Sequence, residues 1–230
     1  MKSALRSCPA LGYGAVRVIR NIVFTSILGL SVAAGAVFAE TPRILALGDS
    51  LTAGYGLPQD EGFVPQLQAW LDKNGAKAQV LNAGVSGDTT AGGAARLEWA
   101  LASGAEGLIV NLGGNDMLRG LDPSVARANL TQILQAAQDK GLPVLLVGMI
   151  APSNYGADYK TEFEAIFPEL SAQFNTLLLP VYFAPIAAQD GGIDPTFMQD
   201  DGIHPNAEGV LRVVAAMGPK VLELLAQTGG

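Results

Sequence analysis

The apolar positions of this chain alternate between two kinds of segment. Short, continuous apolar runs, typical of strands buried on both faces, occur at 44–47, 78–81, 107–112, 143–149 and 176–181. Longer segments between them carry apolar residues at helical spacing. Strands that alternate with helices are typical of a parallel sheet covered on both faces. We therefore predict an α/β protein, a single three-layer α/β/α domain with a five-stranded parallel sheet.

Two of the predicted helices have clear ends in the sequence. Apolar side chains recur at helical spacing from Phe63 to Leu71, and the Asn-Gly pair at 74–75 is a C-terminal signal. Asp122 followed by Pro123 predicts a helix start, because a capping residue then precedes a proline in the first helical position.

The first 39 residues have the features of a secretory signal peptide. Four basic side chains lie within the first 20 residues, and an apolar, uncharged run follows at 22–38. Small side chains at the end of that run predict cleavage after Ala39. The alternative is an uncleaved membrane anchor, because the run is close to the shortest that spans a bilayer. We expect residues 1–39 to be removed and residues 40–230 to form one periplasmic or secreted domain.

Removal of that segment would change the charge and the thiol content of the chain. All 21 acidic residues follow Ala39, whereas four of the 14 basic residues precede it, so the formal net charge would change from −7 to −11. Such an excess of negative charge argues against nucleic acid as a partner and against stable membrane attachment. The single cysteine, Cys8, would also be lost, which leaves no disulfide and no thiolate chemistry.

Polar or glycine residues follow three of the predicted strands at the point where each strand ends. Asp49 and Ser50 come directly after the first strand. Gly87 lies in the loop after the second strand, and Asn115 follows the third. Because the carboxyl ends of parallel strands meet at one edge of a sheet, we expect these residues to lie close together.

A possible base for Ser50 lies far down the chain. His204 is the only histidine, and Asp201 precedes it by three residues, so a single turn can bring this carboxylate to the imidazole. Neighbouring Asp200 could do the same, and the spacing alone does not decide between the two. A serine hydroxyl, an imidazole and a carboxylate together form the triad of nucleophilic acyl transfer. Each residue alone is more often structural, so the prediction rests on the combination.

These motifs resemble the four blocks of a known enzyme family. Gly-Asp-Ser-Leu at 48–51, Gly87, Gly-Gly-Asn-Asp at 113–116 and Asp-Gly-Ile-His-Pro at 201–205 resemble the blocks of the SGNH (GDSL) hydrolases, in the same order. Further segments are similar to a periplasmic group of multifunctional thioesterases, lysophospholipases and arylesterases within that family: 86–89, 112–116, 154–156 and 198–205.

The resemblance implies a flavodoxin-like fold and a role for each residue. Ser50 would be the nucleophile, His204 the base and Asp201 the residue that orients it. The backbone amides of Ser50 and Gly87 and the side-chain amide of Asn115 would form the oxyanion hole. The resemblance also implies a small-molecule ester or thioester substrate, no cofactor and a monomer. The neighbouring aspartate of the first block is expected to have a structural role in its turn.

The substrate pocket is harder to predict. The stretch 150–160 has no clear period and is predicted to be a long loop at the same sheet edge. Met149, Ile150, Pro152 and Tyr155 lie in or beside it, and long loops in compact domains are usually functional. We expect these side chains to form a wall for an acyl or aryl group. The alternative is that they only pack the loop against the domain.

Three functions are compatible with these residues. A serine esterase acting on aryl esters, acyl thioesters or lysophospholipids is the leading hypothesis. A carbohydrate esterase that removes acetyl groups is the alternative, and a non-catalytic acyl- or glycan-binding module would lack a triad residue. A metal site is disfavoured, because one histidine and no cysteine after residue 39 leave a poor zinc ligand set.

Overall fold

A computed structural model describes residues 41–228, and the predicted signal peptide lies outside them. Five parallel strands pair in the order β2-β1-β3-β4-β5, the order of flavodoxin-like sheets. The strands are β1 (Arg43–Gly48), β2 (Gln79–Gly84), β3 (Gly107–Asn111), β4 (Val144–Val147) and β5 (Leu177–Leu179). The predicted α/β class and parallel sheet are confirmed.

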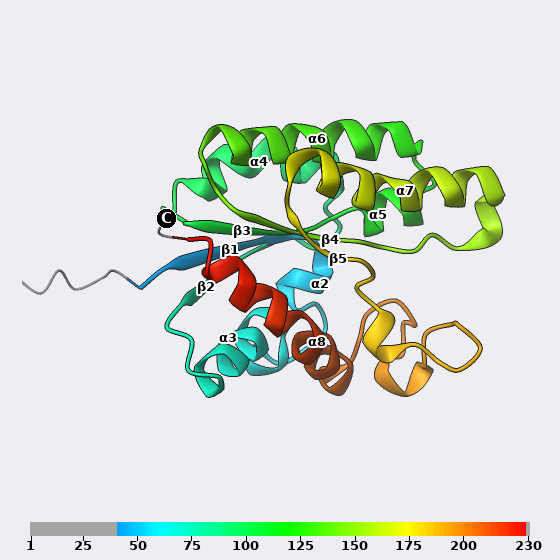
Figure 1. The fold of residues 1–230 in the computed structure, drawn as a ribbon. Coiled ribbons are helices and arrows are strands. Elements are labelled where there is room, and N and C mark those ends of the chain that lie inside the picture. Colours follow the sequence, from blue (N-terminus) through cyan, green and yellow to red (C-terminus); the bar gives the residue numbers. More distant parts are fainter. Residues whose placement is uncertain (1–40, 229–230) are drawn as a thin grey trace, which may run out of the picture. The chain divides into compact units, whose positions relative to one another are not determined.

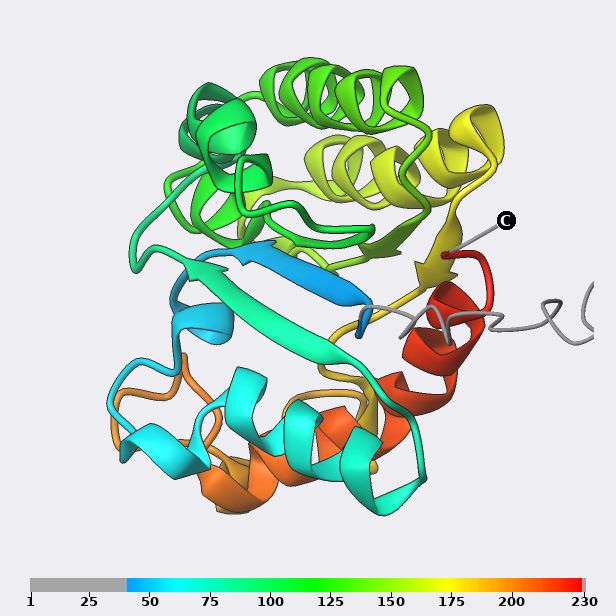
Figure 2. The same ribbon diagram turned by 90° about the vertical axis from the view of Figure 1, so that its left-hand side faces the viewer.

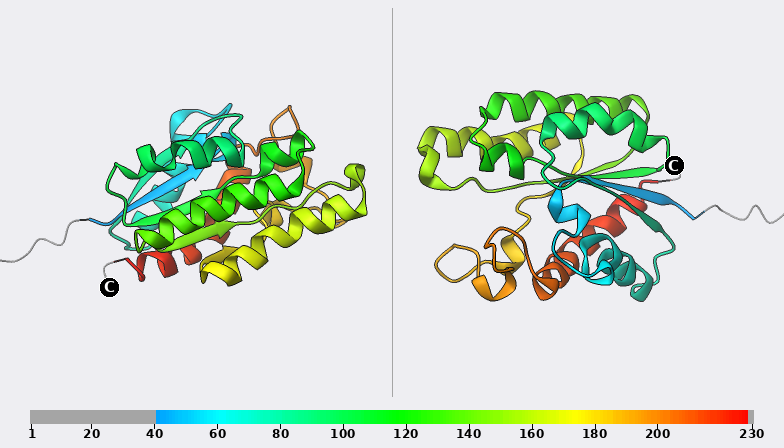
Figure 3. Two further views of the ribbon diagram at one scale, coloured as in Figure 1. Left: turned by 90° about the horizontal axis from the view of Figure 1, so that it is seen from above. Right: turned by 180° about the vertical axis from the view of Figure 1, so that it is seen from behind.

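Helices cover both faces of the sheet (Figures 1 and 2). On one face three helices lie side by side, as Figure 3 shows from above: α4 (Thr90–Leu101), α6 (Pro123–Asp139) and α7 (Ala157–Phe174). The other face is covered by α3 (Phe63–Lys73) and α8 (Ala207–Leu225). Two short helices, α2 (Ser50–Ala53) and α5 (Gly114–Leu118), follow β1 and β3. Within residues 41–228, four 3₁₀ turns lie in the connections: η1 (Gln59–Glu61), η2 (Ser153–Tyr155), η3 (Ala184–Ile186) and η4 (Pro195–Phe197).

The position of each strand explains its sequence pattern. Every residue of β3 and β4 is buried, as expected for central parallel strands, which read as continuous apolar runs. Strand β2 lies at the sheet edge, where Gln68 of α3 covers it: its amide accepts from the Val80 N–H at 2.9 Å and donates to the Ala78 carbonyl at 2.9 Å. This contact occupies backbone groups that would otherwise be open to another chain.

The predicted start of α6 is confirmed. The Asp122 side chain accepts a hydrogen bond from the Ser124 N–H at 2.8 Å, and Pro123 occupies the first helical position. Asp122 therefore supplies the capping acceptor that the sequence pattern predicts.

The long loop predicted at 150–160 is wrong over its last four residues, because α7 begins at Ala157. The side chains of Lys160 and Glu164 bind each other and hold both backbone groups of Ala151, which fixes the first turn. Tyr155, Tyr159 and the following aromatic residue at 163 are neighbours at helical spacing: the first two rings are tilted against each other, and the second and third are stacked. That spacing is the sequence signal for the longer helix.

The loops predicted after β1 and β3 each contain a short helix, α2 and α5. Gly48 lets α2 fold tightly against the strand end, since a Cβ atom there would lie 2.0 Å from Thr52 Oγ1. Helices of four or five residues contain too few apolar positions to show a period. Within residues 41–228, no helix has both the length and the apolar character to span a bilayer.

Candidate active site

Ser50 is the first residue of α2, at the carboxyl end of β1. Strand β1 lies between β2 and β3, so the chain leaves it toward one side for β2 and returns on the other side for β3. Open α/β sheets bind their ligands at such switch points, outside the carboxyl ends of the strands. The loops that carry Gly87 and Asn115 follow β2 and β3, and therefore reach the same edge.

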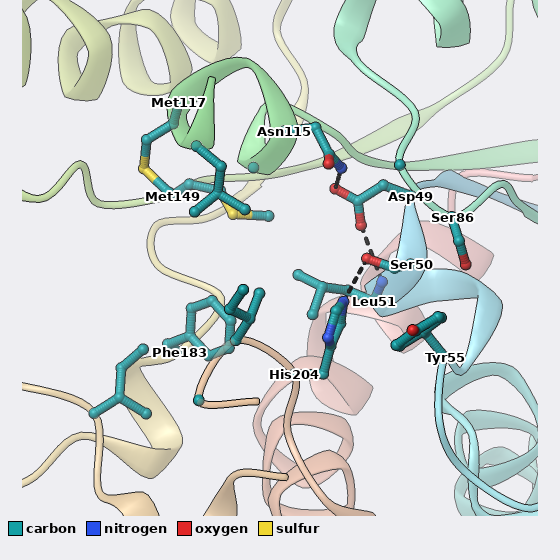
Figure 4. Close-up of a pocket in the computed structure, with 16 residues that line it drawn as sticks. Asp49, Ser50, Leu51, Tyr55, Ser86, Asn115, Met117, Met149, Phe183 and His204 are labelled. Atoms are coloured by element: carbon teal, nitrogen blue, oxygen red, sulfur yellow. Dashed lines mark hydrogen bonds between the residues drawn. The ribbon is translucent and has the colours of Figure 1, made fainter. Parts of the chain in front are cut away.

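Ser50 is hydrogen-bonded to His204, as Figure 4 shows, and His204 is hydrogen-bonded in turn to Asp201. The Ser50 Oγ lies 2.8 Å from His204 Nε2, and His204 Nδ1 lies 2.6 Å from Asp201 Oδ2. The other oxygen of Asp201 accepts from the backbone N–H groups of Ile203, at 2.9 Å, and His204, at 3.0 Å. Of the two neighbouring aspartates, Asp201 is therefore the one that contacts the imidazole.

The contacts of Asp201 also set its charge. Its hydrogen bond with the His204 side chain, followed by those with backbone amides, lowers the pKa of this carboxyl to about 2. Asp201 therefore remains an anion throughout the neutral range. An anion at Nδ1 favours the tautomer in which that nitrogen carries the proton, which leaves His204 Nε2 free to accept the Ser50 proton.

Gln199 holds the segment that carries His204 through several hydrogen bonds. The sequence motifs did not predict this residue. Its backbone N–H donates to the His204 carbonyl at 2.8 Å. Its side-chain amide donates to the carbonyls of Tyr55, at 2.9 Å, and Pro205, at 3.0 Å. The Tyr55 ring lies beside the imidazole, with 4.7 Å between ring centroids. These contacts tie the chain after α2 to the histidine loop.

Three amide groups at or near Ser50 have an N–H that can still donate a hydrogen bond. Among the hydrogen bonds of residues 41–228, none uses the backbone amides of Ser50 or Gly87. The Asn115 amide donates to Asp49 at 3.2 Å and keeps a second N–H. Gly87 has φ +82°, and Arg119 holds its carbonyl at 2.7 Å, which fixes the loop after β2.

A cavity of about 470 Å³ opens above Ser50 and His204. Figure 4 shows Met117, Met149 and Phe183 on one side of the serine, with Tyr55 and Ser86 on the other. Much of the cavity wall is apolar, and is formed by Met117, Leu118, Met149, Phe183, Ile193 and Ile203. A volume of this size is within the usual range for small-molecule sites, about 300–1,000 Å³.

The predicted pocket wall agrees with this cavity only at Met149. Ile150, Pro152 and Tyr155 do not line it, and Ile150 is 52 % exposed. The Tyr155 hydroxyl instead donates to the Leu118 carbonyl at 3.2 Å. Beyond Met149, the loop after β4 thus packs against the end of α5 and does not contribute to the wall.

Asp49 is buried beneath the serine, with 1 % of its surface exposed. Burial raises the pKa of this carboxyl to about 6, although hydrogen bonds from Leu51 and Asn115 and the nearby His204 oppose the rise. Because folding raises this pKa from 3.8, the contribution of Asp49 to stability is present in full below about pH 4 and is lost as the pH rises through 6.

An Asp49→Asn variant has no carboxyl group at this position, so comparison with the native chain should reveal the contribution of Asp49 to the pH dependence of stability. Relative to the native chain, the variant should gain about 3 kcal/mol of unfolding free energy as the pH rises from 4 to 7. Urea unfolding of both proteins at several pH values measures the difference. A difference that stays constant with pH would contradict the raised pKa.

Among the described residues 41–228, no group of three or more His, Cys, Asp or Glu side chains is arranged to hold a metal ion. The polar groups around Ser50 are those of acyl transfer: a hydroxyl, an imidazole, a carboxylate and free N–H donors.

A parallel α/β sheet that carries a hydrogen-bonded serine, histidine and aspartate at its carboxyl edge is typical of hydrolases with a serine nucleophile. The model of the GDSL-like lipase/acylhydrolase family matches residues 46–211. The chain belongs to this family, which confirms the resemblance seen in its sequence motifs.

Several known proteins are similar to this chain over most of its length. Esterase TesA of Pseudomonas aeruginosa is 36 % identical over 208 residues, which cover 90 % of this chain and all of the relative. The thioesterase 1/protease 1/lysophospholipase L1 of Escherichia coli K12 is 39 % identical over 171 residues, 74 % of this chain and 78 % of that protein. The crystal structure of AlinE4, an SGNH-hydrolase family esterase, is similar with a TM-score of 0.67 and 44 % identity, and covers 81 % of this chain and 97 % of its own.

Proposed function

We propose that this chain is a serine esterase that hydrolyses carboxylic esters, among them aryl esters, acyl thioesters and lysophospholipids. The observation that carries the proposal is the hydrogen-bonded chain from Ser50 through His204 to Asp201 at the floor of an apolar cavity. The names of its relatives, an esterase and a thioesterase/lysophospholipase, agree with these substrate classes.

In the proposed mechanism Ser50 Oγ attacks the carbonyl carbon of the ester while His204 Nε2 takes the hydroxyl proton. The 2.8 Å contact between these atoms supports this role. Asp201 stabilises the imidazolium that forms. The tetrahedral intermediate collapses when His204 gives the proton to the leaving alcohol or thiol, which leaves an acyl group on Ser50. Water, deprotonated by His204, then attacks the acyl carbon; the bond to Ser50 Oγ breaks, His204 returns the proton to this oxygen, and the acid is released.

The negative charge that develops on the carbonyl oxygen needs donors that are already in place. We assign this task to the backbone amides of Ser50 and Gly87 and to the second N–H of Asn115. Their freedom from other hydrogen bonds within the described part of the chain supports the assignment. Donors held in position before the reaction stabilise an oxyanion without the cost of reorganising.

Acyl chain length separates this function from a carbohydrate acetyl esterase. In a series of p-nitrophenyl and acyl-CoA substrates, we expect kcat/KM to rise about fourfold per added methylene until the apolar cavity is filled, the equivalent of about 0.8 kcal/mol per buried methylene. A Ser50→Ala protein measured in parallel corrects for hydrolysis without the enzyme. Activity that falls steeply beyond acetyl would favour the carbohydrate esterase instead.

We also propose that residues 1–39 direct export and are then removed, so that the enzyme acts in the periplasm or outside the cell. The basic start, the apolar run and the small residues before position 40 support this.

A further inference from the structure

We propose that Asp49 is a positioning residue for catalysis, which orients the Asn115 amide and the Ser50 helix toward the same oxyanion. This inference rests on the proposed esterase function and adds a residue to its machinery. Asp49 does not touch the substrate in this role, and acts through the two donors that it holds.

One carboxylate contacts two of the three elements that supply the donors, helices α2 and α5. Asp49 Oδ1 accepts from the Leu51 N–H at 3.0 Å, and Leu51 is the second residue of α2, directly after Ser50. Asp49 Oδ2 accepts from Asn115 Nδ2 at 3.2 Å. Figure 4 shows Asp49 between Asn115 and Ser50. A shift of this carboxylate would therefore move the serine amide and the asparagine amide relative to each other.

The packing around this carboxylate leaves it little freedom. A Cβ atom on Gly114 would lie 3.3 Å from Asp49 Oδ2, so α5 approaches the carboxylate closely through a glycine. Gly113, the residue before α5, has φ +115°, and a Cβ atom on it would lie 3.4 Å from the ring of Phe167 and 3.5 Å from that of Phe163. The helix that carries Asn115 is thus held between the aromatic side chains of α7 and Asp49.

Helix capping alone does not require an acid at this position. Serine or asparagine would cap the Leu51 N–H about as well, without the cost of burying a charge. That cost is visible in the pKa of Asp49, which burial raises to about 6; the buried Tyr182 hydroxyl and His204 are the other titratable groups that interact with it. A carboxylate that is retained at such a cost is typical of a functional site.

A carboxylate differs from the neutral caps in accepting hydrogen bonds at both oxygens and donating none. An asparagine side chain can present either its oxygen or its NH₂ group, and the partner decides which. Facing Asp49 Oδ2, Asn115 must turn its NH₂ group inward, and the same NH₂ group then has its second proton for the oxyanion. The acid therefore ensures that Asn115 offers a donor and not its carbonyl.

A double-mutant cycle tests this coupling. Asn115→Ala should lower kcat by about 100- to 1,000-fold, the usual loss for one oxyanion donor. Asp49→Asn and Asp49→Ser keep a cap for Leu51 but lose the acceptor for Asn115, and each should lower kcat at least tenfold with little change in KM. Added to Asn115→Ala, either substitution should change kcat by less than about threefold, because the two residues act as one unit.

The results of this cycle can overturn the role of Asp49 without overturning the proposed esterase function. Titration of active sites with a fluorophosphonate counts the folded enzyme, so that kcat is expressed per site in every variant. Asp122→Asn, at the cap of α6, is the matched control and should leave kcat unchanged. If Asp49 and Asn115 losses multiply fully in the double variant, or if both Asp49 variants keep native kcat, the inference fails while the esterase stands. If Asn115→Ala keeps native kcat, the oxyanion assignment and the inference fall together.

Discussion

Replacement of Ser50 by alanine should lower kcat on p-nitrophenyl esters by at least about 10,000-fold, because loss of the nucleophile of a triad removes nearly all covalent catalysis. The Ser50 Oγ is the atom that His204 Nε2 contacts, and the alanine methyl group cannot attack a carbonyl or give up a proton. Steady-state assays with purified protein measure the loss. Residual activity would come from the oxyanion donors and substrate binding alone.

Two controls, a substitution of another serine and a covalent probe, show whether the loss of activity is specific to Ser50. Ser153 is exposed and lies outside the cavity lining, so Ser153→Ala should change kcat by less than about twofold, as expected for a surface substitution. A fluorophosphonate should add one group to the native protein, located at Ser50 by mass spectrometry, and none to Ser50→Ala. Near-native activity in Ser50→Ala with an unchanged Tm would remove Ser50 as the nucleophile.

The sheet could be predicted because its central strands are buried on both faces. A short, continuous apolar run between two helical segments, such as the one in β3, is typical of a buried parallel strand, and the parallel order then brings the strand ends together. The two short helices could not be predicted. Each is fixed by tertiary contacts, such as that of Asp116 of α5 with the Thr90 N–H at 2.8 Å and hydroxyl at 2.6 Å, and not by a periodic pattern.

The candidate site was predictable where chemistry limits the choice of residue. A single histidine and three motif blocks lead to Ser50, Gly87 and Asn115, and the structure brings all three to one edge. The cavity wall was not predictable in the same way. Phe183 and Ile193 come from connections without a period, and any apolar side chain of suitable size can fill such a wall.

The identity of the carboxylate illustrates the limit of spacing as a guide to contact. Both Asp200 and Asp201 are close enough to His204 in sequence, and only the backbone path distinguishes them. Asp201 accepts from the N–H groups two and three residues ahead, a tight turn that also brings its second oxygen to the imidazole. Asp200 makes neither contact, although it differs by one position.

Because Asp201 contacts the imidazole and Asp200 does not, the same substitution at the two positions should have very different effects on kcat. Asp201→Asn should lower kcat at neutral pH by about 10,000-fold, as removal of the charge does in other triads, because an amide NH₂ facing Nδ1 favours the wrong tautomer of His204. Asp200→Asn changes the net charge equally and should alter kcat by less than about twofold. The two variants, measured with the same ester from pH 5 to 9, therefore differ in position and not in charge.

Asn is the informative replacement at 201 because it separates the two tasks of this side chain. Its oxygen can still accept from the Ile203 and His204 amides, so the turn is kept, and only the 2.6 Å contact with Nδ1 changes character. A large loss of kcat with an unchanged Tm thus assigns the effect to the imidazole. Equal, small losses in Asp201→Asn and Asp200→Asn would mean that His204 is oriented by its backbone segment, held through Gln199, and needs no carboxylate.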